Sequence, residues 1–360
     1  MDTKTLRVGM IGAGSWAKRH LDAWQTCPET ELVAIYNRTT ARAQAFADEY
    51  AIPDVYGDVE SVLQRADIDI VSISMPHNLH HPIAMAAIAA GKHVFCEKPL
   101  AMDAQQAREM WSSAQRAGIK TGIQFGHRVS PAAVRMRELI QEGAIGEVQY
   151  VEGSTCYDLG SDPAFPLVWR FSKQVAGAGA LADLGVYAID AARWLVGEFT
   201  GVSGQIRTWI KHRPLIPDGY TLHQVIDMYK SSGLNLDADM GQVDNDDECL
   251  FLASFVNGAQ GYFKSSRLYG GEWGIKVYGS RGSLEWEGNK LLGKQQGEET
   301  LSTLEVPALE PAPTIVTQFV TNILNDADLS PTFYDGLQAQ EVMDAVIHSA
   351  EQERWVSLSA

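Results

Sequence analysis

Apolar residues occur in short runs along the first 125 residues, and each run is followed by a stretch with helical periodicity. The runs predict strands and the stretches between them predict helices, two of which end at Gly91 and Gly118. Strands and helices that alternate in this way are typical of a parallel, doubly wound sheet. We expect strands at 6–11, 31–36, around Val55, 67–74, 93–98 and 120–125, and helices that include 17–24, 39–50, 81–91 and 103–118.

The pattern changes after Gly126, where strand-like runs separated by turns replace the regular alternation. Such runs predict an antiparallel or mixed sheet. This part is expected to contain helices at 128–146, 181–196, 314–326 and 335–352, strands over 200–290, and a loop insertion at 211–243. We therefore expect an α/β protein with a doubly wound domain over 1–125 and an α+β domain with a large open sheet over 126–360.

Composition narrows the possible partners. The chain has 360 residues, of which 29 are basic and 45 acidic, and the net charge of −16 disfavours nucleic acid and anionic membranes as partners. The cysteines lack a CxxC pair, so neither a disulfide framework nor a zinc site is expected. Because no stretch approaches 18 consecutive apolar residues and no signal peptide is evident, we expect a cytoplasmic protein without a membrane span.

The sequence GAGSWA at 12–17 follows the first expected strand and opens a helix. In that context Gly12 allows a tight turn, Gly14 lets the backbone approach a pyrophosphate, and Ala17 is small enough for the helix to pack on the strand. The helix N-terminus would offer amides to the phosphates. An ordinary strand-to-helix turn is the alternative, but the surrounding βαβ pattern favours dinucleotide binding.

The end of the second strand suggests which dinucleotide is bound. NAD-specific folds usually place an acidic residue there to hold the ribose 2′-hydroxyl group. This chain instead has Tyr36, Asn37 and Arg38. Arg38 could pair with a 2′-phosphate, which favours NADP(H) over NAD(H), although a surface arginine without a ligand is the alternative.

Two further segments carry candidate chemistry. Glu97 and Lys98 stand at the end of an apolar strand, where ligands bind in parallel sheets, although two solvated charges would explain them as well. Asp183 and Tyr187 are four residues apart in ADLGVYAID, so an α-helix would place them on one face. That face could be catalytic, or it could be the polar rim of a core helix.

The acidic run DNDDE at 244–248 lacks the spacing of an EF-hand and precedes a strand, so we expect a solvated turn and no metal.

Taken together, these segments resemble the Gfo/Idh/MocA family of oxidoreductases over nearly the whole chain. The resemblance rests on GAGSWA, MPHNLH (75–80), AAGKHVFCEKPLAM, FGHRVSP (125–131), EGAIGEV (142–148), WRF with GAGALADLGVYAIDAARWLVGE, and DGLQAQEVMDAVIHSA. It implies a Rossmann domain, a C-terminal domain with an open sheet, and hydride transfer between nicotinamide and a sugar, cyclitol or related polyol. It also implies a homodimer or homotetramer packed through the large sheets.

The resemblance assigns roles to individual residues. Glu97 would approach the cofactor, Lys98 would orient the substrate and help proton transfer, Asp183 would hold the substrate, and Tyr187 would be the acid/base. A cis Lys98–Pro99 bond is expected. The other cofactor contacts would be Gly12, Gly14, Ser15, Trp16, Asn37, Arg38, Pro76 and His80, and the other substrate-side candidates are His127, Tyr157, Trp169 and Arg170.

Position 187 departs from the commonest family pattern, in which it is histidine, and position 127 is His where Asn is frequent. A tyrosine resembles the branch with glucose–fructose oxidoreductase, dihydrodiol dehydrogenase and sugar 3-ketoreductases, which mostly use NADP. A free tyrosine has a pKa of about 10, so Tyr187 would need Lys98 as a partner to act as a base. The alternatives are an NAD-dependent glycosidase with a tightly bound cofactor and a non-catalytic, dinucleotide-sensing regulator.

Overall fold

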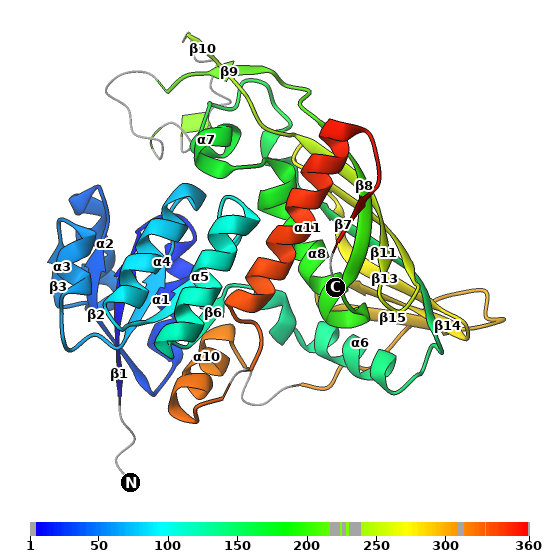
Figure 1. The fold of residues 1–360 in the computed structure, drawn as a ribbon, viewed down its shortest axis with the longest axis horizontal. Coiled ribbons are helices and arrows are strands. Elements are labelled where there is room, and N and C mark those ends of the chain that lie inside the picture. The colour runs from blue at the N-terminus through cyan, green and yellow to red at the C-terminus, as the bar shows by residue number, and fades with distance from the viewer. Residues whose placement is uncertain are drawn as a thin grey trace. The chain divides into compact units, whose positions relative to one another are not determined.

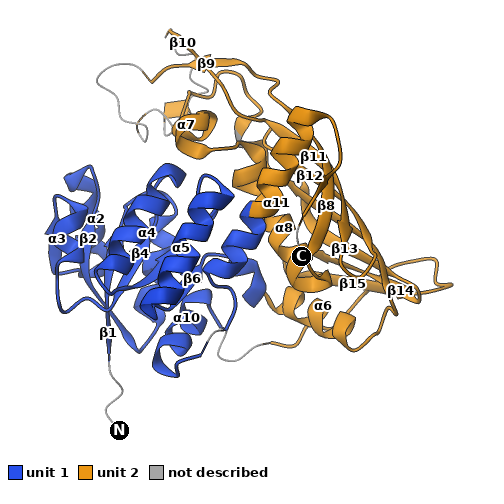
Figure 2. Cartoon of the chain, in the orientation of Figure 1, with its two compact units in different colours: residues 1–129, 309–340 blue, residues 130–308, 341–360 orange. Residues whose placement is uncertain are grey.

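The chain divides into two compact units. The computed structural model (Figure 1) describes residues 5–216, 224, 228–229, 239–308, 313–327 and 329–358. Unit 1 contains residues 1–129 and 309–340, and unit 2 contains residues 130–308 and 341–360 (Figure 2). The division differs from a single cut after residue 125, because the chain returns to unit 1 near its end.

Unit 1 is built on a six-stranded parallel sheet with the strand order β3-β2-β1-β4-β5-β6. The order reverses between β1 and β4, and ligands bind at such a switch point in doubly wound folds. This confirms the predicted doubly wound sheet. The strands are β1 Leu6–Ile11, β2 Thr30–Tyr36, β3 Asp54–Tyr56, β4 Ile70–Ile73, β5 His93–Cys96 and β6 Thr121–Ile123.

The helices of unit 1 follow the predicted connections. Asp103 caps α5 by accepting a hydrogen bond from the Gln106 amide at 2.8 Å, and Gly118 ends that helix with a positive φ of 66°. The helices are α1 Ala17–Thr26, α2 Thr40–Tyr50, α3 Val59–Leu63, α4 His80–Ala89, α5 Ala104–Ala117 and α10 Ile315–Leu324, with 3₁₀ turns at His77–Leu79 and Gly126–Val129.

Helix α10 joins unit 1 through an aromatic cluster. Its Phe319 ring lies 6.3 Å from Trp24 of α1 and 5.6 Å from Phe95 of β5, measured between ring centroids. All three side chains are buried. The Trp24 contact is edge-on and the Phe95 contact is tilted, and aromatic pairs of this kind add to the gain from burying their area.

Unit 2 contains a nine-stranded mixed sheet with the order β16-β15-β14-β13-β7-β12-β11-β8-β17. Only the β7–β12 pair is parallel among these described strands, so the prediction of a large mixed sheet is confirmed. The strands are β7 Val148–Cys156, β8 Phe199–Arg207, β11 Glu248–Phe255, β12 Gln260–Ser266, β13 Glu272–Gly279, β14 Gly282–Glu287, β15 Lys290–Gln295, β16 Ser302–Thr303 and β17 Val356–Ser357.

Helices cover one face of this sheet. Alternate residues of β11 are buried and half-exposed or exposed, as expected for a sheet covered on one side. Helix α8 packs on β7 and β13, where Gly153 leaves room for Ala188. The helices are α6 Pro131–Gln141, α7 Lys173–Ala176, a π-helical turn at Leu181–Gly185, α8 Val186–Val196 and α11 Phe333–Gln352, which starts in unit 1, with 3₁₀ turns at Asp158–Gly160 and Trp169–Phe171.

The predicted insertion at 211–243 falls largely outside the described residues. Its ends form a small antiparallel pair, β9 His212–Pro214 and β10 Met240–Gln242. The stretch Lys173–Val196 is long and apolar enough to cross a membrane, but 67% of its apolar window is buried within the structure. We therefore describe it as a core helix of unit 2.

Candidate active site

Gly12 forces a tight turn at the carboxyl end of β1. Its φ of +113° suits glycine alone, and a Cβ atom there would lie 2.1 Å from the Ser74 carbonyl oxygen. Gly14 is also open, since a Cβ atom would approach the Ser74 oxygen no closer than 4.0 Å, and Ser15 is exposed. A bare backbone turn that leads into α1 fits a dinucleotide pyrophosphate.

Asn37 ties this turn to the end of β2. Its Oδ1 accepts a hydrogen bond from the Ala13 amide at 3.1 Å, and its Nδ2 donates to the Thr39 carbonyl at 3.1 Å. Arg38, the next residue, is exposed. Asn37 therefore supports the shape of the turn, while Arg38 is the side chain at this position that is open to a ligand.

Glu97 is buried in a chain of polar groups beneath the turn. His20 Nε2 donates to its carboxylate at 2.9 Å, Ser72 Oγ lies 2.9 Å from His20 Nδ1, and Trp24 donates to Ser72 at 2.9 Å. Burial raises the pKa of Glu97, but the hydrogen bond from His20 and the nearby charges lower the pKa by more. The net pKa is below the usual value, so Glu97 carries a charge at neutral pH.

Lys98 follows directly and is 4% exposed. Its amide donates to the other Glu97 oxygen at 3.1 Å, and its Nζ lies 5.9 Å from the centre of the Trp16 ring. The expected cis Lys98–Pro99 bond is confirmed. Trp16, the residue before α1, thus connects the glycine turn with the Glu97–Lys98 segment.

His80 lies within hydrogen-bond distance of both loops that follow β4 and β5. Its Nδ1 lies 2.8 Å from the Pro99 carbonyl oxygen and its Nε2 lies 2.8 Å from that of Met75, the neighbour of Pro76. The ring is fully buried, and this burial lowers the pKa of His80 more than the two carbonyl oxygens raise it. A contact of Pro76 and His80 with the cofactor stays a prediction.

In unit 2, Asp183 and Tyr187 do not lie on one regular α-helix. Leu181–Gly185 is a π-helical turn, and α8 begins only at Val186. The prediction of an α-helix from residue 181 is therefore wrong at its start, because this turn is wider than an α-helical one. Single π-turns inside helices occur frequently at functional sites.

The two side chains have different partners within unit 2. The Asp183 carboxylate pairs with Arg170 Nε at 3.2 Å, and the Arg170 guanidinium lies 4.3 Å from the Trp169 ring centre. The Tyr187 ring packs against Trp273 of β13, with centroids 5.2 Å apart. The family resemblance gave Arg170 and Asp183 as separate candidates, but not their pairing, and Trp273 was not among its candidates.

The remaining two substrate-side candidates are Tyr157 and His127. Tyr157 follows β7 in unit 2 and is 56% exposed. His127 belongs to unit 1, where its ring lies 5.7 Å from that of Phe125. Their roles stay predictions. Among the described residues, no group of three His, Cys, Asp or Glu side chains could hold a metal ion.

The acidic run at 244–248 is not a solvated turn, and that prediction is wrong. Asn245, Asp246 and Asp247 are 5%, 4% and 0% exposed. They make hydrogen bonds to backbone groups and to the buried Arg267. The high density of acidic residues led us to expect exposure to solvent. In the structure these side chains instead form hydrogen bonds with buried backbone groups, and sequence spacing does not reveal such contacts.

Comparisons with known proteins agree with both units. A family model described as "Oxidoreductase family, NAD-binding Rossmann fold" matches residues 6–125, and one for the "GFO/IDH/MocA C-terminal domain" matches 133–285. The chain belongs to the Gfo/Idh/MocA oxidoreductase family. Members of this family bind a nicotinamide dinucleotide in the first domain and include dehydrogenases and reductases of sugars and polyols.

Several relatives of the family cover the whole chain. Levoglucosan dehydrogenase of Pseudarthrobacter phenanthrenivorans is 32% identical, over 99% of this chain and 98% of the relative. Inositol 2-dehydrogenase of Rhizobium meliloti is 25% identical, over 99% of this chain and 100% of the relative. A solved levoglucosan dehydrogenase in complex with NADH and L-sorbose has a TM-score of 0.87 at 30% identity, covering 98% of this chain and 99% of the other.

Proposed function

We propose that this family member is an NAD(P)-dependent dehydrogenase that oxidises a secondary alcohol of a sugar, an anhydrosugar or a related polyol, or reduces the corresponding carbonyl. The carrying observation is that Asp183, paired with Arg170, and Tyr187, packed on Trp273, follow one another along a single helical segment. Carboxylate, guanidinium and aromatic faces together suit a polyhydroxylated ring, whose hydroxyl groups need charged hydrogen-bond partners. The named activities of the relatives point the same way.

The residues of unit 1 fit a nicotinamide dinucleotide. Gly12 and Gly14 leave the backbone open for the pyrophosphate, and Ser15 and Trp16 border that turn. Glu97 would face the nicotinamide half from the end of β5, held by His20. When bound, the nicotinamide supplies the hydride acceptor or donor.

The chain's own contribution to the chemistry is proton transfer. Tyr187 would take the proton from the substrate hydroxyl during oxidation and return it during reduction. A phenol with a pKa of about 10 is a poor base at neutral pH, so an ammonium group must stabilise its phenolate. Lys98 is the side chain that we assign to this task, and the two groups would titrate as a pair.

Asp183 and its neighbours would orient the substrate. Its carboxylate has oxygen atoms for adjacent hydroxyl groups, and the ion pair with Arg170 directs it. Trp169, which the Arg170 guanidinium covers, and the exposed Tyr157 offer apolar faces to the C–H side of a sugar ring. We place His127 on the substrate side as well.

We also propose that NADP(H) is preferred over NAD(H). No carboxylate follows β2, and the exposed Arg38 can meet a 2′-phosphate. A levoglucosan dehydrogenase has been solved with NADH, so both cofactors have to be measured on this protein.

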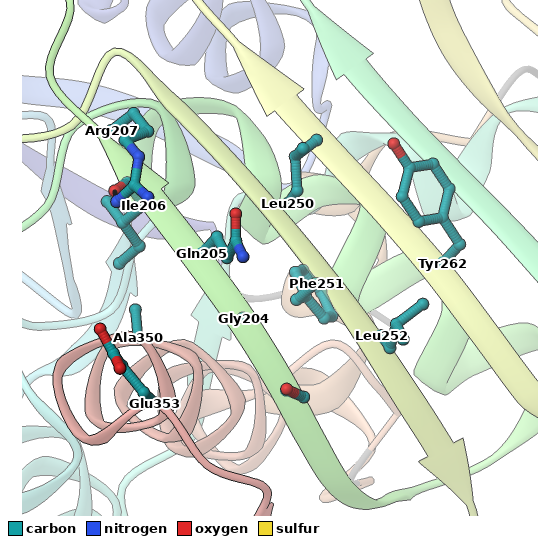
Figure 3. Close-up of a pocket in the computed structure, with 11 residues that line it drawn as sticks. Gly204, Gln205, Ile206, Arg207, Leu250, Phe251, Leu252, Tyr262, Ala350 and Glu353 are labelled. Atoms are coloured by element: carbon teal, nitrogen blue, oxygen red, sulfur yellow. Dashed lines mark hydrogen bonds between the residues drawn. The ribbon is translucent and has the colours of Figure 1, made fainter.

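We further propose a homodimer or homotetramer that uses the uncovered face of the nine-stranded sheet. Leu252 is 55% exposed on this face, and Leu250 and Tyr262 alternate on it with buried residues. Beside them a hollow of about 530 Å³ follows β8 and β11, with Ala350 and Glu353 also lining it (Figure 3). Leu252→Glu should lower the mass measured by light scattering, and a monomeric wild type would contradict the proposal.

The function is tested by titrating the protein with NADPH and NADH, and then measuring turnover on a panel of sugars, anhydrosugars and cyclitols. Net reduction of the cofactor by one polyol class is the expected result. Release of a free sugar from a glycoside without net cofactor turnover would identify a glycosidase instead. Cofactor binding without any turnover would identify a sensing protein.

A further inference from the structure

The segment before β11 holds both partners of the Arg170–Asp183 ion pair. Residues 243–247 connect β10 to β11, and Asn245 and Asp246 in this segment are almost completely buried. One of these two residues contacts the turn that carries Arg170, and the other contacts the turn that precedes Asp183. Both contacts lie within unit 2.

Asp246 fixes the backbone just before Asp183. Its two carboxylate oxygens accept hydrogen bonds from the amides of Gly179 at 2.5 Å and Leu181 at 2.9 Å, and its carbonyl accepts from the Ala180 amide at 2.9 Å. The Asp183 amide in turn donates to the Gly179 carbonyl at 2.9 Å. A Cβ atom at residue 179 would lie 1.8 Å from the Asp246 carbonyl oxygen, so the two backbones are as close as glycine allows.

Asn245 fixes the other side of the ion pair. Its Nδ2 donates to the Arg170 carbonyl at 2.8 Å, and its Oδ1 accepts from Arg267 Nη2 at 2.8 Å. Arg267 donates to the same Arg170 carbonyl at 3.0 Å and lies 4.3 Å from the Phe171 ring centre. Two buried side chains, Asn245 and Arg267, thus donate hydrogen bonds to the Arg170 carbonyl.

We propose that Asn245 and Asp246 are positioning residues that place Arg170 and Asp183, and through the π-turn Tyr187, against the substrate. The proposal rests on the proposed function, because it concerns the same site. It assigns to two buried residues the task of holding the substrate-binding ion pair in place.

A purely stabilising role explains Asp246 poorly. Burial raises the pKa of this carboxyl, and the amides of Leu181 and Gly179 offset that only in part. A buried carboxylate therefore costs stability that a neutral side chain would not. What the carboxylate provides is two acceptors directed at two amides of one turn, which a neutral amide side chain cannot supply through its single oxygen.

The first test is Asp246→Asn, which keeps the volume but leaves one of the two amides without an acceptor. We expect hydrogen exchange of residues 177–187 to become faster, and kcat/KM for the polyol to fall about 10- to 100-fold, while the cofactor dissociation constant is unchanged. Asp183→Asn should lower kcat/KM much less in the Asp246→Asn background than in the wild type, because the two substitutions affect the same interaction.

Val346→Ala is the matched control for simple loss of stability. Val346 is fully buried in unit 2 beside Gly204 of β8, in neither of the two turns. It should lower the melting temperature without changing kcat/KM or exchange at 177–187. Losses in Asp246→Asn and Asp183→Asn that simply add, or unchanged exchange at 177–187, would overturn the proposal.

Asn245→Ala keeps the proposal testable if Asp246→Asn does not fold. Arg267 still donates to the Arg170 carbonyl in this variant, so we expect a smaller fall in kcat/KM, again without a change in cofactor binding. Wild-type kcat/KM in Asn245→Ala would contradict the role of this residue. A wild type that is inactive on every polyol would refute the proposed function. Hydrogen exchange at 177–187 does not depend on turnover, so it would still test whether Asn245 and Asp246 hold the two turns.

Discussion

The glycine turn of unit 1 and the π-turn of unit 2 achieve similar positioning in different ways. Around Gly12 and Glu97, the turn and the Glu97–Lys98 segment follow β1 and β5, which flank β4 in one parallel sheet, and His20, which holds Glu97, lies on α1 directly after the turn. Around Asp183, the supporting groups come from loops and strands 65 to 75 residues further along the chain. The comparison teaches that in unit 1 the parallel sheet and the helix after the turn bring the supporting groups together, whereas in unit 2 the ion pair depends on a separate buried loop.

The strongest test of this comparison is Tyr187→Phe on the unit 2 side. The change removes the proton-transfer group but keeps the ring that packs on Trp273. We expect kcat to fall by about 10²-fold or more, the scale of general acid–base catalysis, with cofactor binding unchanged. Steady-state turnover and fluorescence titration measure the two effects, and near wild-type turnover would remove Tyr187 from the mechanism.

Lys98→Ala asks whether unit 1 supplies chemistry as well as a cofactor site. If Lys98 stabilises the phenolate of Tyr187, kcat should again fall by about 10²-fold, and the double variant should lose little more than either single one. Turnover of all three variants decides this. A change confined to KM would mean that Lys98 only binds the substrate. In that case the proton-transfer group would come from unit 2 alone.

Arg38→Ala tests the cofactor preference, which depends on one exposed side chain of unit 1. Loss of a charge-assisted contact to a 2′-phosphate should weaken NADPH binding about 10-fold and leave NADH binding unchanged. The dissociation constants of both cofactors are measured by fluorescence. Equal losses for the two would show that Arg38 does not read the 2′ position.

Glu97→Gln has the smallest expected effect, and this effect is on thermal stability. The pKa of Glu97 is lowered in the folded protein, so its charge contributes stability above its unfolded pKa and loses it as pH falls through the folded value. At pH 7 the variant should melt about 5 °C lower, and its melting temperature should approach that of the wild type as pH falls through the folded pKa of Glu97. A constant difference at all pH values would mean that the charge is not involved.

Much of unit 1 could be predicted from sequence because its signals are local. The glycine turn, the strand ends and the caps of α5 each lie within a few residues, and sheet topology then determines which of them meet. What the sequence did not show is the buried support of Glu97. His20 lies 77 residues from Glu97 along the chain, and a histidine on a helix has no distinctive pattern.

Unit 2 was predicted as a fold but less well as a site. Alternating strands predicted the large sheet, and the family resemblance suggested Asp183, Tyr187 and Arg170 as site residues. The width of the turn at Leu181–Gly185 and the burial of Asn245 and Asp246 were both missed. Both features depend on hydrogen bonds between backbone amides and acceptors that are distant in the sequence. Such hydrogen bonds produce no periodic pattern in the local sequence.

The π-turn before α8 has a consequence for how such a site can change over evolutionary time. A π-turn accommodates one residue more than an α-helical turn. Deleting one residue there would restore regular winding and change which residue of the turn lies one turn before Tyr187. The proposed acid/base group, Tyr187, and the proposed substrate-holding carboxylate, Asp183, could therefore change their relative orientation through a single deletion, with the packing of α8 on the sheet left intact. The helix thereby offers lineages a discrete adjustment of specificity that point substitutions cannot reproduce.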